Sequence, residues 1–127
     1  SELIDNCLAK NQNKTINILN ENNYNDDDCI LVTRTFLIKS KRLLKLKKEL
    51  QNNENIDQII STFKPPIFWK DKDTVKKQAI NYSTKVSELL IRDINKTELQ
   101  IKKNYNNSIN ILLDFMLQES KQINSKI

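Results

Sequence analysis

Residues 63–83 read FKPPIFWKDKDTVKKQAINYS and hold both prolines of the chain, its one tryptophan and two of its four phenylalanines. A helix cannot continue through Pro65 and Pro66, because proline lacks an amide donor and disfavours helical angles in the residue before it. The chain must therefore turn here. One apolar helical pattern ends near Phe63, and another begins just after Trp69.

Three apolar side chains come at the end of this proline corner, which we define as residues 64–69. We expect Ile67 and Phe68 to plug the helical core where the chain turns. Trp69 is expected to lie nearer to water, because a run of alternating lysine and aspartate follows it directly.

Apolar residues recur at three- and four-residue intervals on both sides of the corner, which is the spacing of one helix face. No segment shows the two-residue alternation of a strand, or an Asn-Gly or Asp-Gly hairpin signal. The expected fold is therefore all-α, a single compact bundle of about seven helices with short connections. The expected helices cover residues 1–10, 13–22, 27–51, 56–63, 71–81, 84–103 and 106–123.

Polar residues stand where several of these helices should begin, and Ser1, Asn13, Asp26 and Ser83 are the expected N-caps. Because the chain has no glycine, we expect asparagine to adopt the left-handed angles that helix ends require. The residues expected to face inward include Leu3, Ile4, Cys7, Leu8, Ile16, Leu19, Val32, Phe36, Leu43, Leu46, Leu50, Ile59, Ile60, Val75, Ala79, Ile80, Val86, Leu90, Ile94, Thr97, Ile101, Ile109, Leu112, Leu113, Met116 and Ile123.

The composition leaves little room for catalysis. Without glycine the chain can build neither a phosphate-binding loop nor a glycine-rich dinucleotide turn, and without histidine it lacks the commonest general base and metal ligand. Cys7 and Cys29 have no metal-binding or redox spacing and are expected to be small buried side chains in a reducing cytosol. The acidic run 26–28 suits a helix start without any cation. We expect no enzyme activity, metal or cofactor from this chain alone.

The net charge of +5 favours contact with something acidic, and nucleic acid is the first candidate. One side of the expected helix 27–51 is basic, and its simplest interpretation is a solvated surface. The alternative is an independent helical nucleic-acid-binding module that uses this side as its main surface. No run of about 18 apolar residues is present, so no membrane contact is expected. The basic residues of that side are Arg34, Lys41, Arg42, Lys45 and Lys48.

Two segments of the chain resemble those of a known family. I-F-W-K-D-K at 67–72 places an aromatic residue in a basic setting, and K-T-E-L-Q-I-K-K-N-Y at 96–105 contains the pattern T-E-L-x-[IL]-K-x-x-Y. Together with the order of the elements, from L-I-D-N-C-L-A-K at 3–10 onward, they resemble the C-terminal domain of the delta subunit of bacterial DNA polymerase III. That subunit belongs to the clamp loader, and the resemblance covers essentially the whole chain.

The resemblance implies that residues 1–127 are the helical collar domain of a larger subunit, in keeping with a sequence that does not begin with methionine. Such a domain is non-catalytic within the DNA polymerase III holoenzyme, a nucleotidyltransferase of the bacterial cytoplasm and its nucleoid-associated replisome. Its implied partners are clamp-loader subunits of the gamma/tau and delta-prime type, together with primer–template DNA. The sliding clamp would be contacted only by the N-terminal part of the subunit, which resembles an ATPase without a working nucleotide site.

The resemblance also implies a nucleic-acid contact. Trp69 and Tyr105 match family aromatics that lie near the template strand as it leaves the primer–template junction. Stacking of a base on an aromatic ring contributes about 1–3 kcal/mol and tolerates any sequence, as a loader acting anywhere on a chromosome requires. For Tyr105 the alternative is an ordinary surface residue before a helix. Four lysines beside the two aromatics are expected to bind phosphates: Lys70, Lys72, Lys102 and Lys103.

Overall fold

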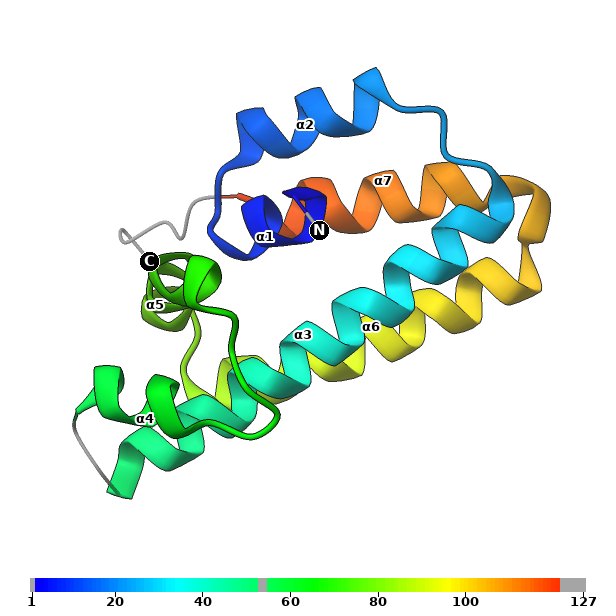
Figure 1. Cartoon of the computed structure of the whole chain (residues 1–127). Helices are drawn as coiled ribbons and strands as arrows, with labels where there is room; N and C mark the ends of the chain where they lie inside the picture. The colour runs from blue at the N-terminus through cyan, green and yellow to red at the C-terminus, as the bar shows by residue number, and fades with distance from the viewer. Residues whose placement is uncertain (1, 53–54, 122–127) are drawn as a thin grey trace.

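The computed structural model describes residues 2–52 and 55–121, and within them the chain forms helices and no strand (Figure 1). The all-α prediction is confirmed. The α-helices are α1 (Glu2–Leu8), α2 (Gln12–Glu21), α3 (Asp26–Asn52), α4 (Ile56–Thr62), α5 (Lys72–Asn81), α6 (Thr84–Lys103) and α7 (Ser108–Glu119), with short 3-10 turns at Trp69–Asp71 and Tyr105–Asn107.

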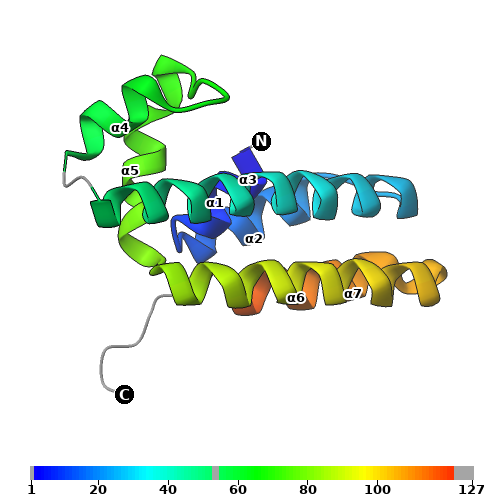
Figure 2. The same cartoon turned by 90° about the horizontal axis from the view of Figure 1, so that it is seen from below.

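The two longest helices, α3 and α6, run side by side in opposite directions and form the spine of the bundle (Figures 1 and 2). From the end of α6 the chain turns back as α7, which packs on both spine helices. The α1–α2 hairpin covers α7, while α5 closes the other end of the spine against α1 and α3. α4 packs on α3 and is tied to α5 by an ion pair between Asp57 and Lys76, and the proline corner follows it at that end of the molecule.

Local hydrogen bonds show how the helices begin. Ser83 caps α6 as predicted, since its hydroxyl accepts from the amide of Val86 at 3.1 Å. The prediction of Asp26 as the cap of α3 is wrong, because Asn25 and Asp28 form a reciprocal capping box. The Asn25 side chain accepts from the Asp28 amide at 2.8 Å, and the Asp28 carboxylate accepts from the Asn25 amide at 3.0 Å.

The cap of α2 is likewise shifted, from the predicted Asn13 to Asn11, whose side chain accepts from the Lys14 amide at 3.3 Å. The helix starts earlier than predicted because the side chain of Asn11, and not that of Asn13, accepts the hydrogen bond from a free amide of the first turn. Ser1, the predicted first cap, and Ile123, a predicted core residue, lie outside the described residues.

Most of the predicted core is buried, and the buried apolar set joins all seven helices. Three predicted core residues are exposed instead. Phe68 lies on the surface, and of the two residues only Ile67 is buried at the corner. Val86 lies in the first turns of α6, beyond the reach of α7, which is eight residues shorter, or about 12 Å at 1.5 Å per residue. Ile80 is 83% exposed, because Val75, Gln78 and Ala79 form the side of α5 that meets its neighbours.

Lys10 adopts the left-handed conformation expected of an asparagine, and its φ of 63° is the only positive value recorded among the described residues. It ends α1 in a Schellman motif, in which the Asn11 amide bonds to the Asn6 carbonyl at 2.9 Å and the Lys10 amide to the Cys7 carbonyl at 3.0 Å. A left-handed residue other than glycine costs about 1–2 kcal/mol. The side chain of Lys10 explains why a lysine stands there.

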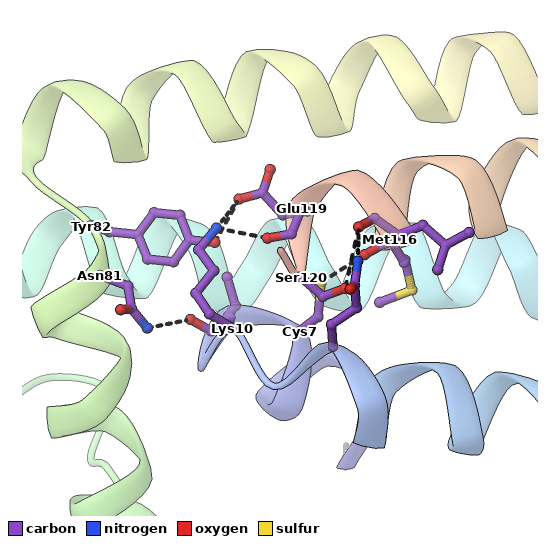
Figure 3. Close-up of polar contacts among 10 residues, drawn as sticks. Cys7, Lys10, Asn81, Tyr82, Met116, Glu119 and Ser120 are labelled. Atoms are coloured by element: carbon purple, nitrogen blue, oxygen red, sulfur yellow. Dashed lines mark hydrogen bonds and ion pairs between the residues drawn. The ribbon is translucent and has the colours of Figure 1, made fainter. Parts of the chain in front are cut away.

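That side chain is buried in a cluster that ties three distant parts of the chain together (Figure 3). The Lys10 ammonium donates to the Glu119 carbonyl at 2.7 Å and to its carboxylate at 3.0 Å, and lies 4.6 Å from the ring centre of Tyr82. The Tyr82 hydroxyl donates to the same carboxylate at 2.6 Å. Burial, with the nearby Glu119 charge, holds the pKa of Tyr82 well above its usual range. We call these three residues the Lys10–Tyr82–Glu119 cluster.

Candidate nucleic-acid interface

The proline corner holds Trp69 in water, with 70% of its surface exposed. Phe63 before the prolines and Ile67 after them are both buried, so the backbone is anchored on either side of the turn. The peptide bond between Lys64 and Pro65 is cis. Beyond Ile67, the Asp71 amide donates to the Phe68 carbonyl at 2.8 Å and closes the 3-10 turn that carries Trp69. The expectation that Trp69 lies near water is confirmed, and Phe68 is exposed beside it.

Lysines from two elements lie at the proline corner, and one of them contacts the Trp69 ring. The Lys70 ammonium lies 5.7 Å from the ring centre of Trp69, within the range of a cation–π contact. Lys72, half-buried, opens α5. From α3, Lys45 donates to the Lys64 carbonyl and lies 5.0 Å from the ring centre of Phe63. The sequence placed Lys45 on a separate basic side, and only the fold brings it to the corner.

Tyr105 occupies a different environment. It begins the 3-10 turn between α6 and α7, is 41% exposed, and donates its hydroxyl to the carboxylate of Asp27 at the start of α3. That hydrogen bond, with some burial and the Asp27 charge, raises the pKa of Tyr105 to about 12. Lys102 pairs with Glu98 at 2.7 Å, while Lys103 is exposed. The acidic side chains around this aromatic weaken attraction for phosphate.

The fold does not bring the two predicted aromatics together. Tyr105 bonds to Asp27 near the beginning of α3, whereas Lys45 touches the corner that carries Trp69. These two α3 residues are separated by about 27 Å at 1.5 Å per residue. Figures 1 and 2 agree that the α4–α5 end and the α6–α7 turn lie at opposite ends of the molecule. The predicted site is therefore two groups: Trp69 with Lys70 and Lys72, and Tyr105 with Lys102 and Lys103.

The groups that could support chemistry are few. Burial raises the pKa of the Cys7 thiol well above its usual range and that of Cys29 to about 11, which disfavours the nucleophilic thiolates. Among the described residues, no three His, Cys, Asp or Glu side chains gather closely enough to hold a metal ion.

In the same part of the chain, no helix has both the length and the apolar character needed to cross a membrane.

No family model, curated protein or solved structure matches the chain.

Proposed function

We propose that the chain is a non-catalytic assembly domain of a bacterial clamp loader, the collar domain of a delta-type subunit of DNA polymerase III. Its partners would be loader subunits of the gamma/tau and delta-prime type, in the cytoplasmic replisome. It would also touch primer–template DNA while the loader places the sliding clamp. The two segments at 67–72 and 96–105 and the all-α bundle support this proposal.

The observation that carries the DNA part of the proposal is the outward position of Trp69 on an anchored turn. An exposed indole ring is a large apolar surface that is stabilised when a partner covers it. Its flat face is a surface on which a base can stack. Since Phe63 and Ile67 anchor the turn on both sides, its backbone needs little further ordering on binding. Lys70 beside the ring supplies a cation for a neighbouring phosphate.

The separation of the two groups decides how DNA would lie on the domain. A strand rises 3.4 Å per base in B-form geometry, so one strand that touched both Lys45 and the Asp27 end would span about eight nucleotides. The Trp69 group carries the base contact in this proposal, because Asp27 and Glu98 lie among the cations of the Tyr105 group. Tyr105 is assigned a secondary contact.

Assembly is tested by mixing the purified chain with the gamma/tau- and delta-prime-type subunits of its own organism. The proposal predicts that the chain co-elutes with them in size-exclusion chromatography as part of one complex. Failure to associate, under conditions where the full-length delta subunit does, would remove the collar role.

A second candidate is the independent nucleic-acid-binding module. It is favoured by Lys41, Arg42 and Lys48 on α3, which take part in no ion pair among the described residues. Such a module would bind duplex or single-stranded DNA by itself at moderate salt, with a steep loss of affinity as salt rises. A collar domain would bind feebly alone and gain affinity only with its partner subunits.

A further inference from the structure

One side of α3 faces solvent and combines apolar with basic side chains. Leu31 and Ile38 are 64% and 68% exposed, and since they are seven residues apart they lie in one row along the helix. Basic side chains flank this row on both sides. We define the α3 outer face as residues Leu31, Arg34, Ile38, Lys41, Arg42 and Lys48.

The packing of the bundle does not account for this face. The residues that α3 buries, such as Phe36 and Leu43, point to its other side, where α6 and α7 pack. Lys39 shows how a lysine of α3 is satisfied within the fold, since it pairs with Asp5 of α1 at 2.7 Å. On the outer face Arg34 reaches Glu98 at 3.7 Å, while the other three cations form no ion pair among the described residues.

A shallow hollow borders the outer face between α3 and α6. It has a volume of about 480 Å³ and is lined in part by Arg34, Leu37, Leu99 and Lys102. Leu99 is itself more than half exposed. Two aliphatic pairs thus lie on either side of Arg34: Leu31 with Ile38, both exposed, and the partly buried Leu37 with the exposed Leu99.

We propose that the α3 outer face docks an amphipathic helix of a partner protein whose leucine-like row is flanked by glutamate or aspartate. A helix laid along α3 would cover Leu31 and Ile38 with its apolar row, and its acidic flanks would meet Lys41, Arg42 and Lys48. Bound nucleic acid would use the cations and leave the two aliphatic side chains without an apolar partner. A second copy of the same face is disfavoured because the like charges repel. The inference rests on the assembly role proposed above and specifies the face and the chemistry of the neighbour.

The first probe is a synthetic helical peptide with leucine at heptad spacing and glutamate on both flanks, and its control carries lysine in place of glutamate. Binding to the chain is measured by fluorescence anisotropy of the labelled peptide. The acidic peptide should bind, with an affinity that falls as salt rises, and the basic peptide should not. No binding of the acidic peptide, or equal binding of both, would overturn the proposal.

Two variants, each with a control elsewhere on the surface, locate the binding surface. Leu31→Ser/Ile38→Ser should lower the affinity for the acidic peptide by about tenfold or more. Ile80→Ser removes an even more exposed aliphatic side chain elsewhere and should leave that affinity unchanged. Lys41→Glu/Arg42→Glu should also weaken it, and Lys77→Glu/Lys85→Glu, with the same change of charge, should weaken it much less. Circular dichroism confirms that each variant is folded. Equal losses in a variant and its control would contradict the assignment of this face.

The remaining outcomes separate this face from its rivals and from the assembly role. Suppose that a DNA oligonucleotide binds the wild-type chain but not Lys41→Glu/Arg42→Glu, and that the acidic peptide does not bind at all. The α3 outer face is then a nucleic-acid surface and the proposal is wrong. If the chain joins the loader subunits and the outer-face variants join equally well, the collar role stands and the face is wrong. If the peptide binds at the outer face and the loader subunits do not, the face stands and the collar role is wrong.

Discussion

Trp69 and Tyr82 are two aromatic residues of the same 63–83 stretch, and the fold uses them in opposite ways. Tyr82 is fully buried, with its hydroxyl bound to Glu119 and the Lys10 ammonium over its ring. Trp69 is 70% exposed on a turn anchored at Phe63 and Ile67. The comparison separates a side chain that holds the bundle together from one that the bundle presents to solvent.

The largest expected effect is the loss of the buried aromatic. Tyr82→Ala should lower the free energy of unfolding by about 3–5 kcal/mol, because it opens a cavity and removes a partner of Glu119. Urea unfolding followed by circular dichroism measures this. Trp69→Ala is the control and should change the same free energy by no more than about 0.5 kcal/mol. Similar losses for the two variants would remove the distinction.

Binding should show the reverse order. In the assembled loader, Trp69→Ala should weaken primer–template binding by about 1–3 kcal/mol, similarly for different template sequences. Tyr82→Phe, which keeps the buried ring, is the control and should leave DNA affinity unchanged. Clamp opening without DNA should not change in Trp69→Ala, because the proposal places that activity in another part of the subunit. A loader that holds DNA as tightly with Trp69→Ala as without it would show that the indole makes no base contact.

A smaller effect should appear at high pH. Burial raises the pKa of Tyr82 in the folded chain above that of the unfolded chain, which is about 10. The stability that this shift contributes is complete below pH of about 10 and is lost as pH rises further, by up to about 1.4 kcal/mol per pH unit, because only the unfolded chain releases the proton there. Tyr82→Phe should therefore lose stability less steeply than the wild type above pH of about 10. Denaturant midpoints across this pH range test it, and parallel curves would contradict it.

The smallest expected effect separates charge from stacking at the corner. Lys70→Ala should reduce the slope of log affinity against log salt by about 0.7–0.9, as expected for one lost phosphate contact. Trp69→Ala should leave the slope nearly unchanged while lowering affinity at every salt concentration. A lower slope in both variants would mean that the corner binds DNA by charge alone.

Local patterns predicted much of this fold. Helical spacing and the Ser83 cap predicted α6 with the bounds that the structure has, and the double proline predicted the corner. These features depend on residues close together in sequence, whose effects on the backbone are direct. Helical spacing, capping residues and the double proline therefore predicted the helices and the turn that carries Trp69.

Two caps were misplaced by one or two residues, and the misses in the core and in the candidate site involve contacts between residues far apart in sequence. The apolar period of α5 could not show that Gln78 faces inward while Ile80 faces solvent. The inward position of Gln78 is stabilised by its side-chain amide, which donates to the backbone carbonyl of Asp5 at 3.2 Å. Nothing near Tyr82 in the sequence predicts its burial, because its hydroxyl bonds to Glu119, which is 37 residues away. For the same reason the sequence could not show that Trp69 and Tyr105 lie at opposite ends of α3. These positions depend on which helices pack together, and the sequence of one helix does not show that.

The central claim is that a base stacks on Trp69 when the loader holds primed DNA. The chain contains one tryptophan, so 5-fluorotryptophan supplied only to this subunit places a single fluorine label at that ring. The account predicts that the fluorine resonance shifts when primer–template DNA is added to the assembled loader, and that it shifts less when the template lacks bases at the contact. An unchanged resonance, while a separate label shows that the DNA is fully bound, would contradict the claim.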